Sequence, residues 1–433
     1  MATARLDRRG LYRKGAQSLK PMKVLVLSRS YPNSVTELLG LWAEQLVRDS
    51  TRFCEPKVVS PVPYCPPLPG PLRAYTRFRR IESRCRHNGI EVFHPRFLAG
   101  PGYSLYNFEA ALYAAGIRKC VADLRRNFDF DLIHAHFTYP DGVVAIELGR
   151  LYNVPVIVTE HIPWDVWAAK YPKVRERAAQ AALRCAYHVS VSESVRRTVE
   201  ESTGQKDNFV VVPNGVDGSL FTAGENGQKR SRNQILFAGA VRPIKGVDVL
   251  LRAVRLLVNQ GVDANLLVVG EAYYGSYRKE ETRLRQLALE LDLETKVRFA
   301  GKKSPADLAA DMRESAVLVL PSRAESFGMV LVEALASGTP VVATRCGGPE
   351  DIVNDQVGVL VPKEDPEALA KGIRHVLEHT EEYPPAKLRA HALEKFGLEP
   401  VGNRMARLYE QSVENFQSSG AAISRAQGGS LAN

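Results

Sequence analysis

Two glutamates of this 433-residue chain have the type and the spacing to act together on a ligand. Glu325 and Glu333 bracket the string ESFGMVLVE. Eight steps of helix rise roughly 12 Å, so the two carboxylates cannot share one proton. That separation also makes them poor candidates for flanking a single glycosidic bond. The spacing instead suits the two ends of one long ligand.

The backbone between these glutamates has its own chemistry. We expect a helix to start around Phe327, Gly328 and Met329. The free N–H groups of a helix start favour a phosphate, and a glycine lets a ligand approach the backbone closely. A ligand with hydroxyls at both ends and a diphosphate between them is a nucleotide sugar. The alternative is an ordinary helix with an exposed Glu325 and a partly exposed Glu333.

The flanking segments predict where this junction lies. Residues 316–320 form a short apolar run rich in β-branched residues, which is typical of a buried parallel strand. Residues 330–335 are apolar at helical spacing, and Gly338-Thr339-Pro340 ends that pattern. A second buried strand follows at 341–344. The glutamates therefore flank a strand–loop–helix junction at the carboxyl edge of a parallel sheet, where open α/β sheets bind ligands.

The string ESFGMVLVEALASGTPVVAT, followed by CGGPEDIV, resembles the donor-site motif of family 4 glycosyltransferases. The resemblance extends over roughly residues 22–415 and is strongest in the second half. It implies an α/β chain of GT-B fold, with two Rossmann-like parallel-sheet domains facing each other across a cleft. It also implies that Glu325 binds the hydroxyls of the transferred sugar and that Glu333 binds the ribose hydroxyls.

A pair of cations follows another predicted strand, at residues 234–239. Lys245 offers a point charge, and Arg242 offers a planar fork for phosphate oxygens. The alternative is two solvated cations in a loop. Family members often carry an arginine five residues before the lysine, but Ala240 stands there. Either Arg242 reaches the diphosphate from two residues later, or one cation is missing.

The first half of the chain repeats the strand–loop–helix pattern. A strand at 23–27 leads through a loop to Gly40 and a helical pattern, without a G-x-G-x-x-G. The resemblance puts Gly40 opposite the donor diphosphate and His161, in TEHIPWD, beside the transferred sugar and the acceptor. His136 is expected to support that site. A lone histidine is more often structural, and no third ligand has the spacing of a metal site.

The chain is long enough for two domains of ordinary size. We predict a disordered basic tail at 1–21 and an N-terminal Rossmann-like, acceptor-binding domain at 22–212. A C-terminal Rossmann-like, nucleotide-sugar-binding domain should cover 213–386. A C-terminal helix at 387–417 should cross back to the first domain, with a disordered tail at 418–433.

Composition limits the partners and the compartment. The net charge of +10 suits nucleotide phosphates or anionic lipid. Nucleic acid ranks last as a partner, because zinc-finger spacing and aromatic-interleaved basic stretches are missing from the sequence. Six scattered cysteines without a C-x-x-C pair indicate reduced thiols in a cytoplasmic protein. The sequence predicts neither a signal peptide nor a membrane-spanning helix.

Residues 72–86 are the most basic stretch, with six arginines against one acid. Leu72, Tyr75, Phe78 and Ile81 recur every third residue. As a helix, this segment would carry an apolar stripe with cationic flanks, which suits the surface of an anionic membrane. The alternative is a solvated basic loop whose aromatic residues pack on the domain. The first interpretation predicts a peripheral protein at the inner membrane face.

The resemblance implies a retaining hexosyltransferase, and we expect it to need neither a metal nor a cofactor. It would use a nucleotide sugar as donor and a saccharide acceptor, lipid-linked, in exopolysaccharide or other cell-surface polysaccharide synthesis. Two alternatives stay open: a nucleotide-sugar epimerase or phosphorylase of similar fold, and a non-catalytic GT-B scaffold. The side chains do not distinguish a uridine, guanosine or adenosine donor.

Overall fold

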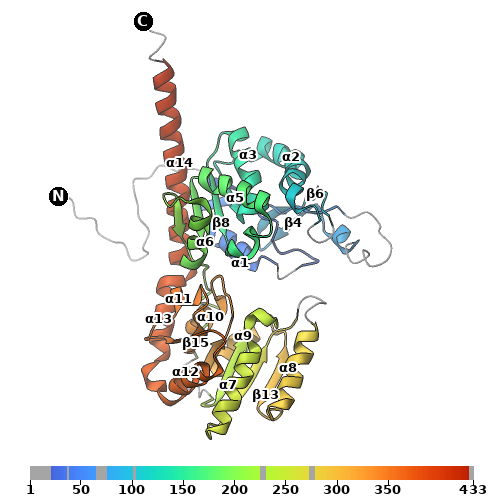
Figure 1. Cartoon of the computed structure of the whole chain (residues 1–433). Coiled ribbons are helices and arrows are strands. Elements are labelled where there is room, and N and C mark those ends of the chain that lie inside the picture. The colour runs from blue at the N-terminus through green and yellow to red at the C-terminus, as the bar shows by residue number, and fades with distance from the viewer. Residues whose placement is uncertain are drawn as a thin grey trace, which may run out of the picture.

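The computed structural model describes residues 21–36, 39–64, 76–100, 104–224, 231–272 and 278–428. Its two α/β domains lie one above the other in Figure 1, and a long C-terminal helix runs along the first. The predicted tail residues 1–20 and 429–433 lie outside the described residues.

The first domain is built on an eight-stranded sheet in the order β10-β9-β8-β7-β1-β2-β5-β4. Its strands pair in parallel, except that β4 is antiparallel to β5. The strands are β1 (Met22–Leu27), β2 (Cys54–Val59), β4 (Arg84–His87), β5 (Ile90–Phe93), β7 (Leu132–His136), β8 (Val156–Glu160), β9 (Tyr187–Ser190) and β10 (Phe209–Val211). Beside this sheet β3 (Val62–Pro63) pairs with β6 (Arg96–Phe97).

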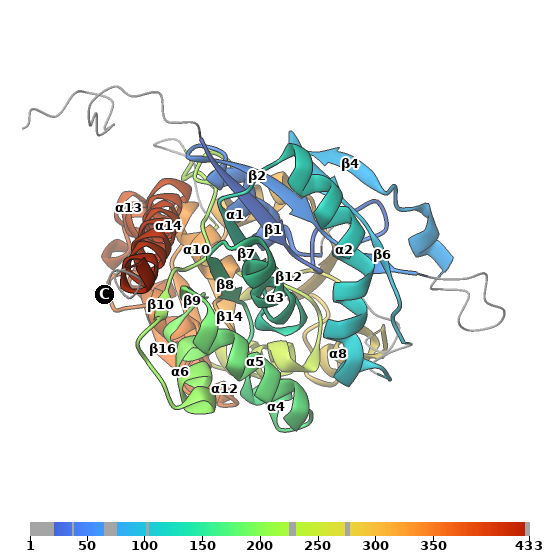
Figure 2. The same cartoon turned by 90° about the horizontal axis from the view of Figure 1, so that it is seen from above.

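Helices cover both faces of this sheet, as a buried parallel sheet requires. They are α1 (Leu41–Ser50), α2 (Glu109–Asn127), α3 (Val143–Tyr152), α4 (Asp165–Ala168), α5 (Pro172–Arg184) and α6 (Glu193–Thr203), with short turns η2 (Tyr106–Phe108) and η3 (Thr138–Gly142). Figure 2 shows α2 on the side of the sheet opposite to the C-terminal helix α14 (Leu398–Gly428).

The second domain has a six-stranded parallel sheet in the order β13-β12-β11-β14-β15-β16. Its strands are β11 (Gln234–Ala238), β12 (Asn265–Val269), β13 (Val297–Gly301), β14 (Val317–Leu320), β15 (Val341–Thr344) and β16 (Gly358–Val361). Its helical elements are η4 (Pro243–Lys245), α7 (Val247–Asn259), α8 (Arg278–Glu290), α9 (Pro305–Glu314), α10 (Met329–Ala336), α11 (Pro349–Ile352), α12 (Pro366–Glu378), η6 (Thr380–Glu382) and α13 (Pro385–Phe396).

Each sheet has a point from which the chain order runs outward in both directions, and these two places matter for function. The second sheet runs outward from β11 toward β13 on one side and from β14 toward β16 on the other. The first sheet reverses in the same way between β1 and β7. Doubly wound sheets bind their ligands in the crevice at such a switch point, outside the carboxyl ends of the strands.

The chain passes between the domains twice, and the two crossings lie side by side. The N–H of Val216 donates to the carbonyl of Phe396 at 2.7 Å, and Val216 and Gly397 form an isolated parallel bridge. A Cβ on Gly397 would lie 2.5 Å from the Leu393 carbonyl oxygen. This close contact explains why a glycine separates α13 from α14.

The predicted single helix over 387–417 is therefore two helices that meet at Gly397. The prediction of a disordered tail from residue 418 was wrong for residues 418–428, because α14 continues to Gly428. Val401, Met405 and Tyr409 on α14 are buried in a core cluster of the first domain. This buried face holds the crossing helix on the first domain.

The arginine-rich stretch also differs from its prediction. Residues 76–80 form a short helical turn, but Arg84–His87 forms edge strand β4, and Leu72 and Tyr75 lie outside the described residues. Ile81 is buried, and Arg96 donates through Nη1 to the carbonyl of Phe78 at 2.7 Å. The apolar side of the described part therefore packs on the domain, as the alternative interpretation had it, while its arginines stay exposed.

Among the described residues, every helix is too short or too polar to cross a membrane.

We expect Met405→Ala to lower the free energy of unfolding by about 2–5 kcal/mol. The Met405 side chain is fully buried, so its removal leaves a cavity in the core. Urea denaturation followed by tryptophan fluorescence measures this loss. The matched control is Asn403→Ala on the exposed face of α14. Equal stability of the two variants would contradict the packing of α14 against the first domain.

Candidate active site

An ion pair lies at the switch point of the second sheet. Lys245 ends turn η4 after β11, and Glu325 lies in the loop after the adjacent strand β14. The Lys245 Nζ lies 2.5 Å from Glu325 Oε2, and the Ser322 hydroxyl donates to the same oxygen at 3.3 Å. The two charged side chains are only 21% and 15% exposed. Two predicted site residues thus meet directly at the carboxyl edge of the sheet.

The loop that carries Lys245 has little freedom. Gly246 has φ 66°, and a Cβ there would lie 2.0 Å from the Pro321 carbonyl oxygen. Only glycine lets the β11 loop pack so closely on the β14 loop. Arg323 donates its backbone N–H to the Ile244 carbonyl at 2.8 Å, which joins the two loops again.

Arg323 also holds the start of α7. Its Nη1 and Nη2 each lie 3.0 Å from an oxygen of Asp248. Burial raises the pKa of Asp248, but this forked pair outweighs it and leaves the pKa below its ordinary value. Arg323 and Asp248 therefore position the loop of Lys245, a role that sequence reasoning missed.

Arg242 lies on the same short turn as Lys245. It occupies the N-cap position of η4, and its carbonyl accepts from the Lys245 N–H at 2.9 Å. Its side chain is partly buried. Both predicted cations thus come from one turn.

A second glycine contact holds the Glu325 loop. The Glu325 N–H donates to the Cys346 carbonyl at 3.2 Å, and the Gly348 N–H donates back to the Glu325 carbonyl at 2.8 Å. A Cβ on Gly348 would lie 2.3 Å from Phe327 Cα. Sequence reasoning gave Gly347 and Gly348 no individual role. The adjacent pair of glycines in CGGPEDIV was nevertheless a sign that two backbone segments approach closely there.

Helix α10 starts with its amide groups open. Gly328 is its N-cap with φ 105°, and no side chain caps the helix. The first N–H groups of a helix have no partner within it, so they are available to an anion. The Phe327 side chain is buried against Phe396, with ring centroids 5.8 Å apart. Phe327 can therefore face a ligand only through its backbone, and Met329 is partly buried.

Glu333 lies one turn into α10 and is partly buried. Burial raises the pKa of Glu333 to about 7. Within the described part of the chain its carboxylate has no salt-bridge partner. Such a carboxylate suits a ligand that donates hydrogen bonds without carrying charge.

In the first domain His161 follows β8 and is almost enclosed. The Trp42 ring covers it at a centroid distance of 3.7 Å, and His161 Nε2 lies 3.1 Å from His136 Nδ1. Burial, with His134 nearby, lowers the pKa of His161 well below its usual range. Within the described residues, its buried Nδ1 has no hydrogen-bond partner. His161 is therefore neutral near pH 7, and its unpartnered Nδ1 is enclosed by the protein.

Trp42 and Glu160 are site neighbours that sequence reasoning gave no role. Trp42 stands two residues after Gly40, which begins α1 with φ 78° and packs on the Ser30 carbonyl. Buried Glu160 accepts from the N–H of His161 at 2.9 Å and from Trp164 Nε1 at 3.0 Å. These contacts fix the backbone at His161. The sequence feature that could have pointed to Trp42 is an aromatic residue in the first helical turn after Gly40.

The carboxyl-edge loops of the two sheets touch at the Glu325 loop. The Ser192 hydroxyl, after β9, donates to the Ser326 carbonyl at 2.6 Å. The N–H of Glu193 donates to Asp351 Oδ2 at 2.7 Å. The ion pair and the helix start of the second domain therefore lie where the first domain meets them.

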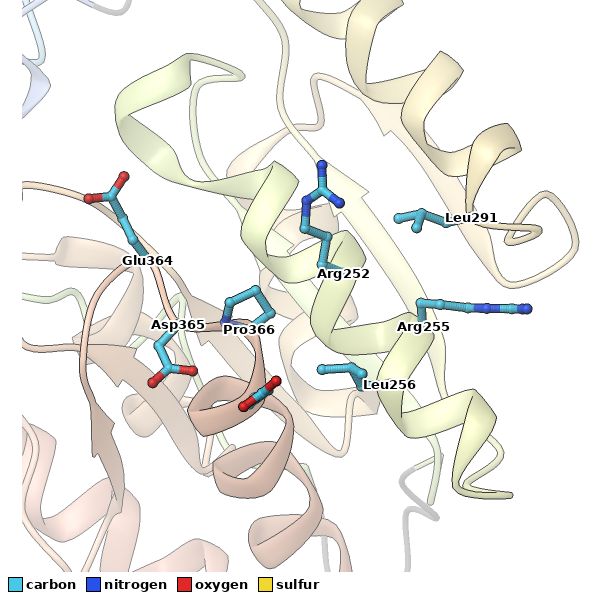
Figure 3. Close-up of a pocket in the computed structure, with 8 residues that line it drawn as sticks. Arg252, Arg255, Leu256, Leu291, Glu364, Asp365 and Pro366 are labelled. Atoms are coloured by element: carbon cyan, nitrogen blue, oxygen red, sulfur yellow. The ribbon is translucent and has the colours of Figure 1, made fainter.

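One surface pocket of the second domain lies apart from these residues. It lies between α7 and the loop that begins α12, and its lining includes Arg252, Arg255 and Glu364 (Figure 3). None of the candidate site residues lines this pocket.

Comparisons with known proteins place this arrangement in a family. Residues 221–392 match the model of glycosyl transferases group 1, and residues 23–220 match that of glycosyltransferase family 4. The chain therefore belongs to the family 4 glycosyltransferases and has the GT-B fold.

Its relatives carry the same class of name. The D-inositol 3-phosphate glycosyltransferase 1 of Catenulispora acidiphila is 33% identical over 317 residues, which are 67% of this chain and 74% of that protein. An uncharacterized glycosyltransferase of Methanocaldococcus jannaschii is 30% identical over 279 residues, 64% of this chain and 74% of that one. This chain is a glycosyltransferase.

Solved structures share the fold at lower identity. Sucrose-phosphate synthase from Thermosynechococcus elongatus matches with a TM-score of 0.73 at 20% identity, over 90% of this chain and 98% of that one. Anabaena HepE in complex with UDP-glucose matches with a TM-score of 0.68 at 20% identity, over 90% and 100%.

The Glu333 carboxyl should make stability depend on pH. Its pKa is raised from 4.5 in the unfolded chain to about 7 in the folded one, so the folded state loses stability as pH rises between these values. Above pH 7 the loss reaches about 3 kcal/mol, at 1.36 kcal/mol for each unit of pKa. Glu333→Gln should therefore be more stable than the wild type at pH 8 and nearly equal at pH 4.

Urea denaturation at both pH values measures this difference. The control is Glu314→Gln at an exposed position on α9 of the same domain. A Glu333→Gln variant that gains nothing at pH 8 would show that the carboxyl is well solvated in the folded protein.

Proposed function

We propose that this glycosyltransferase moves a hexosyl group from a nucleotide diphosphate sugar to a saccharide acceptor with retention of the anomeric configuration. The observation that carries the proposal is the Lys245–Glu325 ion pair at the switch point, beside the uncapped start of α10. A diphosphate between these groups would meet a cation on one side and open amide N–H groups on the other.

The proposed reaction balances without a further reactant. The bond from the anomeric carbon to the diphosphate oxygen breaks, and its electron pair leaves with the nucleotide diphosphate. The acceptor hydroxyl oxygen bonds to the anomeric carbon on the same face, and its proton passes to the departing phosphate. Lys245 and Arg242 stabilise the charge that grows on the diphosphate, a term that is often the largest in catalysis. The proposal assigns no step to a metal or a cofactor.

Each remaining site residue has a part in this proposal. Glu325 accepts from the hydroxyls of the transferred sugar, and Lys245 orients its carboxylate. Glu333 accepts from the ribose hydroxyls, and Gly40 leaves room for the diphosphate at the first domain. The neutral ring of His161, held by Trp42 and His136, orients the transferred sugar and the acceptor.

The donor base is the next question. Because the structure of HepE was solved with UDP-glucose, UDP and UDP-glucose are the first donors to test, followed by GDP and ADP and their sugars. A large increase in the thermal midpoint with one base identifies the donor class, since a ligand at 100 times its dissociation constant adds about 2.7 kcal/mol to the free energy of unfolding.

The alternative functions predict other outcomes. An epimerase would convert the donor without an acceptor, and a scaffold would neither hydrolyse nor transfer it.

We expect Lys245→Ala to lower kcat by roughly 10²–10³-fold, the effect of losing one preorganised charge at the reacting centre. Initial rates with saturating donor measure the loss, and NMR of the product anomer tests retention. Lys303→Ala is the matched control, because Lys303 also pairs with a mostly buried carboxylate, that of Asp311, in the same domain. An unimpaired Lys245→Ala enzyme would remove Lys245 from the mechanism.

We also propose that the acceptor is lipid-linked, in cell-surface polysaccharide synthesis, and that the protein meets an anionic membrane through the first domain. Support comes from exposed arginines at the β4 edge: Arg77, Arg79, Arg80, Arg84 and Arg86. Each arginine near an anionic surface contributes about 1 kcal/mol.

Arg79→Ala/Arg80→Ala should therefore bind phosphatidylglycerol vesicles roughly 10- to 30-fold more weakly. Vesicle co-sedimentation at low salt measures the binding. The control, Lys363→Ala/Lys371→Ala, removes two exposed charges from the second domain. Equal binding by both double variants would reject the β4 edge as the contact.

A further inference from the structure

A pocket at the amino edge of the first sheet lies far from the candidate active site. It opens between the C-terminal ends of α3 and α5 and helix α14 at Phe416. Its volume is about 500 Å³, within the range of roughly 300–1,000 Å³ that is usual for small-molecule sites. Val156, which begins β8, lines this pocket, whereas His161 follows the other end of the same strand. Four steps of strand rise about 13 Å, so the pocket and the candidate site lie at opposite ends of β8.

The floor of this pocket is apolar. Ile146, Val154, Val156 and Cys185 line it, and each of them is only 5–8% exposed. Phe416 forms one wall and is 37% exposed. A ligand with an apolar part would therefore find a preformed surface to contact.

Two arginines line the same pocket. Arg150 lies in the last turn of α3 and Arg184 in the last turn of α5, and both are exposed. Among the described residues, the lining contains no acidic side chain, and neither guanidinium forms an ion pair. Leu151 and Leu183, each next to one of these arginines in the sequence, are 63% and 44% exposed. Unopposed positive charge thus lies beside apolar surface.

The helix ends explain the two arginines only in part. A cation in the last turn of a helix is favourable, because it meets the negative end of the helix. That effect needs no apolar floor between the two side chains. Because a guanidinium has several N–H donors, it can face a helix end and still bond an anion.

We propose that this pocket binds an anionic amphiphile, a molecule with a phosphate or carboxylate head on one alkyl or acyl chain. The guanidinium groups of Arg150 and Arg184 donate charge-assisted hydrogen bonds to the head. The chain lies on the apolar floor and against Phe416, which removes apolar surface from water. The pocket is separate from the donor site, so its ligand is independent of the proposed function.

The position of α14 favours a dispersed molecule over a lipid within a bilayer. Helix α14 continues from Phe416 to Gly428, about 18 Å of helix past the pocket. Figure 1 shows this helix extending beyond the first domain on the side away from the second. A flat bilayer would therefore meet the end of the helix before it reached the pocket.

Titration calorimetry on the full chain, with and without saturating UDP, tests this ligand class. The probes are hexyl, octyl and decyl phosphate below their micelle-forming concentrations. Inorganic phosphate supplies the head alone, and decyltrimethylammonium supplies the chain with the opposite charge. Affinity for the alkyl phosphates should rise about 4-fold for each CH₂ that the pocket buries, and UDP should not change it. Inorganic phosphate and the cationic amphiphile should bind at least about 10-fold more weakly than decyl phosphate.

Two variants remove different parts of the pocket. Arg150→Gln/Arg184→Gln should weaken the binding of decyl phosphate roughly 10- to 30-fold, because two charges near the head are lost. Phe416→Asp should weaken it as well, because it places a carboxylate on the wall. The matched control is Arg118→Gln/Arg175→Gln, which removes two exposed arginines from α2 and α5 outside the pocket lining. It should bind decyl phosphate as the wild type does.

Four results would overturn the proposal. They are no binding of decyl phosphate, equal binding of decyltrimethylammonium, an equal loss in the two double arginine variants, and competition with UDP. The first would leave the arginines with their helix ends alone, and the last would place the probe at the donor site. Co-sedimentation with phosphatidylglycerol vesicles that only Arg150→Gln/Arg184→Gln loses would identify a bilayer lipid and overturn the choice of a dispersed ligand.

Discussion

The ion pair between Lys245 and Glu325 lies at the centre of the candidate site in the second domain. Two charges that are largely removed from water are costly unless their geometry is fixed. Here the loops after β11 and β14 fix it, because Gly246 packs against Pro321 and Gly348 packs against Phe327. The rigid backbone thus holds both charges before any ligand binds, which is the condition for electrostatic catalysis without reorganisation.

The two domains contribute different electrostatics to their contact. The second domain brings two cations, a helix start and two carboxylates. The first domain brings neutral groups, since burial keeps His161 uncharged and Trp42 covers its ring. A charged leaving group and an uncharged saccharide would each meet a matching surface.

The geometry between the domains depends on parts of the chain that are far from the ligand. Two adjacent crossings join the domains at Val216 and Gly397. Beyond them, α14 completes a core of the first domain with Met405 and Tyr409, and the Tyr409 hydroxyl lies 2.7 Å from His134 Nδ1. Helix α14 therefore contacts His134, which lies near His161. Substitutions on α14 can change the site without touching a ligand.

The sequence by itself determined the class of fold and the loops on which the charges stand. Apolar runs of strand length predicted β11 and β14, and the helical spacing that follows predicted α10. These are local patterns, so they also placed Lys245 and Glu325 in the loops after strands. Strand β4 and the length of α14 were missed, because their environment comes from β5 and from the first-domain core. The contact of Lys245 with Glu325 and the cover of Trp42 over His161 join residues distant in the chain. Only the tertiary structure decided them, because strand order, which no local pattern encodes, sets which loops become neighbours.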